Sequence, residues 1–212
     1  MKPAFLNMQK MPLLYRCILF IAYCYCKFFL RLRVQIKGKI PKGPALIAAN
    51  HTSYLDPPLV AVSFPEEIHF LARVGLFKNP VFGWFIRNLN AHPIHGDGKD
   101  MAVFRTVSEI LSNNQKVLIF PEGKRSFDGE LEPLKQGVAL MSLKNQCCPI
   151  IPCWIDGALK AWPRKRKLPH LFGKITVYFG EAVNVQEKDD VRENLKQIMS
   201  ELEEKMKALR PR

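Results

Sequence analysis

The chain has 212 residues, of which 48% are hydrophobic and 24% are charged, a composition that excludes a disordered chain. The length suits one sizeable core with appendages and is short for two full domains. Lys and Arg number 32 against 19 Asp and Glu, and the net charge of +13 favours an anionic partner, either nucleic acid or a lipid surface.

The N-terminal part of the chain combines positive charge with an apolar run. Nine Lys and Arg precede the first acidic residue, Asp56, and Cys17–Cys26 is a run of ten apolar residues flanked by Arg16 and Lys27. The run is shorter than the roughly 20 residues of a spanning helix, and no cleavage site of a secretory signal follows it. We predict that residues 1–33 form a helical, membrane-associating segment. A span with snorkelling cations and a buried core helix are the alternatives.

Beyond this segment, hydrophobic patterning predicts strands that alternate with helices. Strands are expected at residues 33–39, 45–49, 68–72, 116–120, 149–155 and 174–179, with a short extended piece at 92–95. Helices are expected at residues 57–64, 79–88, 100–112, 134–144 and 191–209, with turns or loops at 41–44, 96–98 and 121–129. This alternation predicts an α/β fold in residues 34–212, with a mixed, mostly parallel sheet flanked by helices.

Three of these elements have specific sequence signals. Residues 45–49 are uniformly apolar, which is typical of a strand buried on both faces. Asp56 is expected to cap the following helix, with Pro57 in its first position. In residues 191–209, apolar side chains recur at helical spacing and the opposite face is charged, which indicates a helix packed on the core.

Asn50–Pro57, with the sequence NHTSYLDP, follows the second predicted strand and contains His51 and Asp56. A neutral imidazole can take a proton from a hydroxyl, and a nearby carboxylate can fix its tautomer and stabilise the imidazolium. Two metal ligands, or a turn with a helix cap, are the alternatives. No metal site is predicted, because the six cysteines and the other histidines lack metal-ligand spacing.

Phe120–Ser126, with the sequence FPEGKRS, follows another predicted strand. In α/β sheets, sites gather beyond the carboxyl ends of the strands, so the two motifs are expected to lie close together. Gly123 permits unusual backbone angles, and Lys124, Arg125 and Ser126 supply donors suited to a phosphate. Alone, this stretch would equally suit an exposed charged loop.

Together, the two motifs resemble the glycerolipid acyltransferase family, in particular bacterial 1-acylglycerol-3-phosphate acyltransferases. Leu134–Ala139 and Ile150–Pro152 support the resemblance, which covers residues 38–183. It implies a single acyltransferase domain in residues 34–212. It also implies transfer of a fatty acyl group from acyl-CoA or acyl-acyl carrier protein to 1-acyl-sn-glycerol 3-phosphate, giving phosphatidic acid.

The resemblance also implies roles for individual residues. His51 would be the general base, oriented and charge-stabilised by Asp56. Glu122 and Gly123 would shape the acceptor site, and Arg125 would bind its phosphate. Further candidates for substrate binding are Lys124, Ser126 and Lys135. No protein nucleophile is needed, since the thioester is already activated, and the resemblance implies no metal or bound cofactor.

The sequence departs from the family pattern at two positions. Where the family's second block has an arginine, Pro93-Ile94-His95 is followed by Gly96, and Lys124 stands where a threonine is usual. We hypothesise that Lys124 supplies the cation that the second block lacks.

The expected partners are membrane lipids, the lysophospholipid and the acyl-CoA or carrier protein, at the cytoplasmic face of the bacterial inner membrane. Residues 162–167 could add a second lipid contact. Nucleic acid is not expected, because no recognised binding module is present. Two alternatives remain: an acyltransferase acting on glycerol 3-phosphate or another lysolipid, and a non-enzymatic basic protein that binds membranes or nucleic acid.

Overall fold

The structure is a computed structural model that describes residues 13–95, 101–163, 165–166 and 168–211. Within these residues, seven strands form one sheet in the order β1-β7-β6-β2-β5-β3-β4. The strands are β1 (Arg33–Ile36), β2 (Ala45–Ala49), β3 (Ile68–Arg73), β4 (Ala91–Ile94), β5 (Lys116–Ile119), β6 (Ile150–Asp156) and β7 (Thr176–Phe179). All neighbouring pairs are parallel except β6 and β7, which confirms the mixed, mostly parallel sheet.

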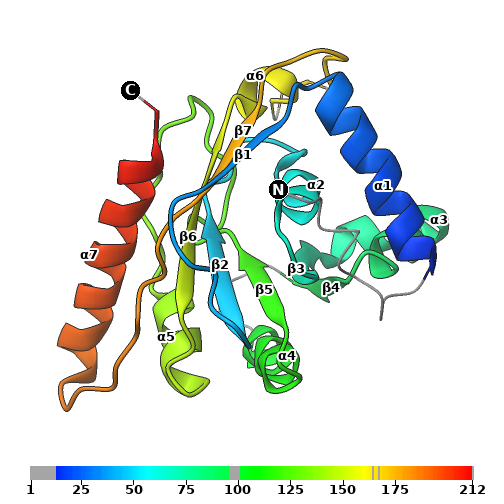
Figure 1. Cartoon of the computed structure of the whole chain (residues 1–212). Helices are drawn as coiled ribbons and strands as arrows, with labels where there is room; N and C mark the ends of the chain where they lie inside the picture. The colour runs from blue at the N-terminus through cyan, green and yellow to red at the C-terminus, as the bar shows by residue number, and fades with distance from the viewer. Residues whose placement is uncertain (1–12, 96–100, 164, 167, 212) are drawn as a thin grey trace.

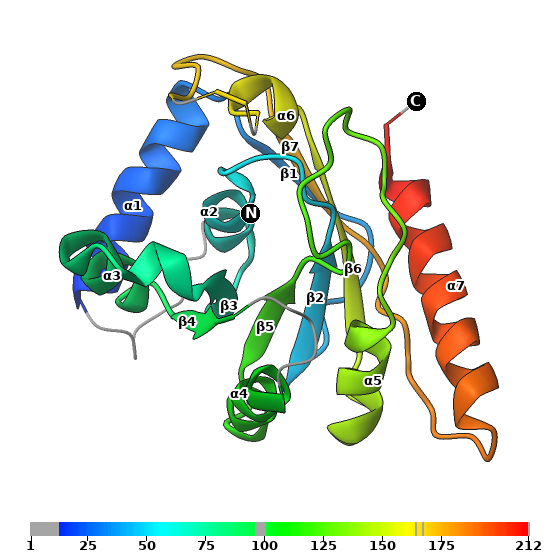
Figure 2. The same cartoon turned by 180° about the vertical axis from the view of Figure 1, so that it is seen from behind.

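Helices cover both faces of the sheet (Figure 1). They are α1 (Leu13–Phe28), α2 (Asp56–Ser63), the 3-10 helix η2 (Val74–Phe77), α3 (Pro80–Arg87), α4 (Met101–Ser112), α5 (Gly137–Lys144), α6 (Ala158–Ala161) and α7 (Val191–Leu209). Helices α1, α2 and α3 pack on one face, and α4, α5 and α7 pack on the other (Figure 2). The flanked α/β sheet is therefore confirmed.

Strand β2 lies in the middle of the core. Ala45 and Ile47 point into the cluster shared with α1 and α2, whereas Leu46 and Ala48 point into the cluster shared with α4, α5 and α7. Successive side chains of a strand point to opposite faces, so burial on both faces requires every residue to be apolar. The uniformly apolar run at residues 45–49 is thereby explained.

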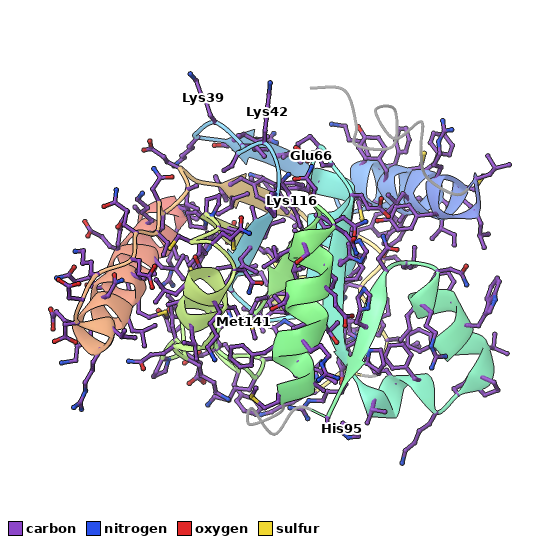
Figure 3. All side chains as sticks on the ribbon, turned by 90° about the horizontal axis from the view of Figure 1, so that it is seen from below. Lys39, Lys42, Glu66, His95, Lys116 and Met141 are labelled. Carbon is purple, nitrogen blue, oxygen red and sulfur yellow. The ribbon has the colours of Figure 1, made fainter. Side chains whose placement is uncertain are left out.

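The amino-terminal edge of the sheet contains a buried cation. Lys116 at the start of β5 is 1% exposed, and its ammonium group donates to Glu66 at 2.5 Å and to the backbone oxygen of Gly43 at 2.8 Å. Figure 3 shows Lys116 and Glu66 pointing toward one another. A buried charge is tolerated only when it is paired, so these contacts account for Lys116.

Helix α1 confirms the predicted helical segment over residues 13–28. Its Tyr15, Leu19 and Cys26 are buried against the core, whereas Leu13 and Ile21 are 73% and 68% exposed. None of the helices in the described part of the chain is long and apolar enough to cross a membrane. Surface association and the boundary between residues 33 and 34 stay predictions.

Some expected boundaries differ from the structure. Asp56 does not cap α2: the helix begins at Asp56, and its carboxylate turns back to the preceding backbone instead. Helix α5 begins at Gly137 rather than residue 134, and the backbone N–H of Lys135 before it donates to the backbone oxygen of Pro121. Helices η2 and α6 were not predicted. The turn at 96–98 and the helix start at residue 100 lie outside the described residues.

Candidate active site

The two sequence motifs meet at one edge of the sheet. Strands β2 and β5 are parallel neighbours, with Ala48 opposite Ile119, so the residues that follow them emerge side by side. His51 follows β2, and the loop 120–129 follows β5. The backbone N–H of Ser126 donates to the backbone oxygen of His51 at 2.7 Å, which joins the two loops.

His51 and Asp56 form a hydrogen-bonded pair. The distance from His51 Nδ1 to Asp56 Oδ2 is 2.8 Å, and the same oxygen accepts the backbone N–H groups of Thr52 and Ser53, both at 2.7 Å. Asp56 is fully buried, whereas the His51 side chain is 19% exposed. Since a carboxylate only accepts, Nδ1 of neutral His51 carries the proton and Nε2 keeps its lone pair. The pair therefore has the arrangement of a general base and its orienting carboxylate.

The imidazole of His51 is held from one side by Phe120. The two ring centroids are 4.0 Å apart and the ring planes differ by 18°, which is a stacked arrangement. The negative face of an aromatic ring attracts a cation. Phe120 thus fixes the plane of the imidazole and stabilises the positive charge that a proton transfer to it would create.

Glu122 holds the backbone of His51 in place. One carboxylate oxygen accepts the His51 backbone N–H at 2.6 Å, and the other accepts the Glu132 backbone N–H at 3.1 Å. Glu122 is 2% exposed, and burial raises the pKa of its carboxyl group to about 7. Its expected contact with substrate stays a prediction; the contacts seen here position His51.

Gly123 and Lys135 lie in direct contact. Gly123 has φ +70, and a Cβ at this position would lie 2.7 Å from Nζ of Lys135. The left-handed backbone favours glycine here, whereas the flexible Lys135 side chain could move away from a Cβ. The exposed side chain of Lys135 consequently lies against the loop that begins beside His51.

Arg125 has an unused hydrogen-bond donor. Its guanidinium lies 3.6 Å from the ring centroid of Tyr54, and its Nη1 is buried without a hydrogen-bond partner among the described residues. Of the candidates for phosphate binding on this loop, Arg125 is therefore the one whose side chain is both oriented and unsatisfied.

Lys124 and Ser126 are already engaged within the loop. Lys124 is 54% exposed and pairs with Glu132 at 3.0 Å. Ser126 is buried, and its hydroxyl bonds to Asp128 and to the backbone N–H of Gly129. Ser126 is thus turned inward, and its predicted role in substrate binding has no support from these contacts.

Comparison with known proteins identifies the family. The acyltransferase family profile matches residues 31–156. The chain belongs to this acyltransferase family. The resemblance found in the two motifs is thereby confirmed.

Several relatives within the family and one solved structure are similar to this chain. The 1-acyl-sn-glycerol-3-phosphate acyltransferase of Bacillus subtilis is 26% identical over 155 residues, which cover 72% of this chain and 74% of that protein. A lyso-ornithine lipid O-acyltransferase of Pseudomonas aeruginosa is 31% identical over 52% of this chain and 46% of its own length. The crystal structure of the Thermotoga maritima 1-acyl-sn-glycerophosphate acyltransferase, PlsC, matches with a TM-score of 0.73 and 27% identity, covering 93% of this chain and 82% of that one.

The matched length varies among the relatives. The chloroplastic 1-acyl-sn-glycerol-3-phosphate acyltransferase of Brassica napus is 29% identical over 139 residues, which make up 64% of this chain and 40% of that protein. The similarity thus spans about two fifths of that plant enzyme.

Three contacts of this acyltransferase site could not be predicted from the motifs. The side-chain amide of Asn50 donates to the backbone oxygen of Ile155 at 3.1 Å and accepts its N–H at 2.7 Å, which ties the loop after β2 to β6. Phe120 stacks on His51, and Tyr54 packs against Arg125. Asn50, Phe120 and Tyr54 lie within the two motifs, but their partners depend on how distant strands pair.

The described residues also contain a cavity of about 210 Å³ beside the loop after β2. Asn50, Thr52, Asp156 and Arg210 are among the residues that line it, whereas His51 and Asp56 are not. A reacting hydroxyl has to reach the imidazole of His51, so the cavity is not where we expect the acyl group to be transferred. No group of three or more His, Cys, Asp or Glu that could hold a metal occurs in the described parts of the acyltransferase.

Proposed function

We propose that the protein transfers a fatty acyl group from acyl-CoA or acyl-acyl carrier protein to the free hydroxyl of 1-acyl-sn-glycerol 3-phosphate, giving phosphatidic acid for phospholipid synthesis. The observation that carries the proposal is the hydrogen-bonded pair of His51 and Asp56, 2.8 Å apart, beside a cationic loop. Relatives named 1-acyl-sn-glycerol-3-phosphate acyltransferase support this choice of acceptor.

The proposed reaction starts at Nε2 of His51. This nitrogen takes the proton of the acceptor hydroxyl while the oxygen attacks the thioester carbonyl carbon. Asp56 and the stacked ring of Phe120 stabilise the imidazolium. The carbon–sulfur bond then breaks, and the imidazolium returns its proton to the departing thiolate. General base catalysis of this kind contributes about 10²–10⁴-fold.

The phosphate of the acceptor is proposed to bind the loop 123–125 and Lys135. Arg125 offers the buried Nη1 that has no partner among the described residues. An unpaired buried donor is costly unless a ligand satisfies it, and guanidinium groups bind phosphate bidentately. Lys135 adds a second cation across Gly123. Lys124 is already paired with Glu132, so it would have to exchange partners to compensate for the missing arginine of the second block.

The protein is proposed to act at the cytoplasmic face of the bacterial inner membrane. The acceptor has its acyl tail in the bilayer, whereas the donor is water-borne, so the enzyme has to act at the interface. The exposed apolar side chains of α1 and the net charge of +13 support attachment to anionic lipid.

The second candidate function is acylation of a different acceptor, such as glycerol 3-phosphate or a lysolipid with another head group. The lyso-ornithine lipid O-acyltransferase among the relatives favours this alternative, as does Gly96 at the position of the second-block arginine. The deciding experiment incubates purified protein with labelled acyl-CoA or acyl-acyl carrier protein and a panel of acceptors: 1-acylglycerol 3-phosphate, glycerol 3-phosphate and lyso-ornithine lipid.

The expected result is rapid acylation of 1-acylglycerol 3-phosphate and its loss in His51→Ala. Faster acylation of another acceptor would select the alternative. If no acceptor were acylated, the catalytic proposal would be wrong and the non-enzymatic alternative would be favoured. If folded His51→Ala kept its rate within about threefold of the unchanged protein, His51 would not be the general base.

A further inference from the structure

Helix α3 and the short helix η2 before it expose a continuous group of large apolar side chains. We define this α3 patch by its members and their exposed fractions: Leu76 47%, Val81 75%, Phe82 45%, Trp84 56% and Phe85 36%. The rings of Phe82 and Phe85 stack at 6.4 Å. Isolated exposed apolar residues are common, but a contiguous group on one short segment marks an interaction surface.

The orientation of the α3 patch is fixed by the packing beneath it. A Cβ on Gly83 would lie 2.9 Å from the backbone oxygen of Phe77, so α3 lies directly against η2. Phe77 and Ile86 pack on the core cluster shared with α1 and α2. Asn79 caps α3 by accepting the Phe82 N–H at 2.9 Å. The exposed side chains therefore belong to a well-anchored helix.

The segment that carries the α3 patch, residues 68–96, has only basic charged residues. Arg73, Lys78 and Arg87 are exposed beside the α3 patch, and none of the residues from 68 to 96 is acidic. The exposed face of α7 differs, since there acidic and basic side chains pair one turn apart. Exposed aromatic side chains flanked by basic residues suit the interface of an anionic bilayer.

Helices α1 and α3 lie on the same side of the molecule in both views (Figures 1 and 2). Both pack on the same core cluster, and both expose apolar side chains outward, including Leu13 and Ile21 of α1. The α3 patch and the exposed face of α1, which is already proposed to bind the membrane, are thus both apolar.

We propose that the α3 patch is a second membrane-binding surface, which inserts into the interfacial layer of an anionic phospholipid bilayer and acts together with α1. The inference rests on the proposed function, since it assumes an acceptor held in the membrane. A single helix would let the protein rotate about its contact with the lipid, whereas two separate contacts fix the direction in which the His51 edge of the sheet faces.

The first test compares matched substitutions in the full-length protein by co-sedimentation with phosphatidylglycerol-containing vesicles. Val81→Ser on α3 is paired with Val191→Ser on α7, because Val191 is also exposed, at 54%. We expect Val81→Ser to weaken partitioning about threefold and Trp84→Gln about tenfold, from the apolar area withdrawn from lipid. Val191→Ser should leave it unchanged. Equal effects of the two serine variants, or no binding by the unchanged protein, would reject the surface.

The second test measures the depth of Trp84 directly. Vesicles with brominated acyl chains quench the fluorescence of inserted tryptophan, and a Trp162→Phe background leaves Trp84 and the buried Trp154. We expect strong quenching that disappears when Trp84 is also replaced by Phe. Unquenched Trp84 in membrane-bound protein would overturn the inference. If Trp84 instead became protected without vesicles, at concentrations where the protein dimerises, the α3 patch would bind a second copy and not lipid.

The inference and the proposed function fail in different ways. Val81→Ser and Trp84→Gln should keep the rate on a short-chain, water-soluble acceptor and lose rate on long-chain acceptor in vesicles. Quenching of Trp84 in a protein that acylates no acceptor would reject the proposed function and support the surface. Full activity on vesicles in both variants, with unchanged partitioning, would reject the surface and leave the function standing.

Discussion

The backbone N–H of His51 donates to the carboxylate of Glu122 at 2.6 Å, across the ends of the neighbouring strands β2 and β5. The backbone oxygen of His51 accepts from Ser126 on the same loop. His51 is therefore fixed by its main chain to the loop that carries the proposed phosphate-binding residues, and by its side chain to Asp56.

The buried carboxyl group of Glu122 should make stability depend on pH. Burial raises its pKa from 4.5 to about 7, so between these values the folded protein keeps a proton that the unfolded chain has released. The free energy of unfolding should thus fall as pH rises from 4.5 to about 7, by of order 1–3 kcal/mol. Below this range the contribution is fully present, and above it no further change is expected.

Glu122→Gln provides the control for this pH dependence, because glutamine does not titrate. Urea unfolding at closely spaced pH values should give a flatter profile for the variant than for the unchanged protein. Other titrating groups contribute equally to both. Two parallel profiles would show that Glu122 does not release its proton in this range.

Asp56→Asn should reduce the rate by at least about 100-fold, since it keeps the shape but removes the charge that stabilises the imidazolium. The amide also presents a donor where Asp56 now only accepts, from His51, Thr52 and Ser53. The rate per folded molecule is the quantity to measure, with folding checked by circular dichroism. A loss of stability with an unchanged rate would assign Asp56 a purely structural role.

Arg125→Ala should raise KM for the phosphorylated acceptor by about tenfold and leave KM for the acyl donor nearly unchanged, because a charged hydrogen bond contributes about 1.5–3 kcal/mol. The guanidinium is held over Tyr54, which orients the unpaired Nη1. Arg125→Lys is the matched control, since it keeps the charge but loses the planar fork. A rise confined to the donor would move Arg125 to the coenzyme or carrier site.

Lys124→Thr tests whether Lys124 replaces the missing second-block arginine. If it does, KM for the acceptor should rise several-fold and the effect should weaken at high salt, because Lys124 is 54% exposed. Glu132→Gln removes its present partner and should then lower KM. Unchanged acceptor binding in Lys124→Thr would reject the compensation and leave Arg125 and Lys135 as the phosphate-binding cations.

The exposed face of α1 should attach the protein to anionic vesicles. Ile21→Ser removes a side chain that is 68% exposed and should weaken co-sedimentation severalfold, with partial release at high salt. Deletion of residues 1–29 is a poorer test, because it would remove three buried side chains of α1 from the core and destabilise the fold. Unchanged binding of Ile21→Ser would shift the anchor to the α3 patch or to residues 162–167, of which Arg164 and Lys167 lie outside the described part.

The sequence by itself determined most of the elements and the pair of His51 and Asp56. The apolar run at residues 45–49 indicated a strand buried on both faces, because period-two burial leaves no polar position. His51 and Asp56 could be identified because a short turn keeps residues five apart within reach, so their contact is local. The helix at 191–209 was equally evident, since its apolar spacing is a local signal.

Only the tertiary structure decided what surrounds that pair. Phe120 stacks on His51 and Glu122 holds its backbone because β5 pairs with β2. These partners are far apart in the chain, and no local pattern specifies which strands become neighbours. The exposure of the apolar side chains of α3 was also decided by tertiary structure. Gly83 packs against Phe77, so the apolar side chains on the other side of the helix are exposed. Local spacing fixes what a segment can form, whereas strand order and packing fix which side chains it meets.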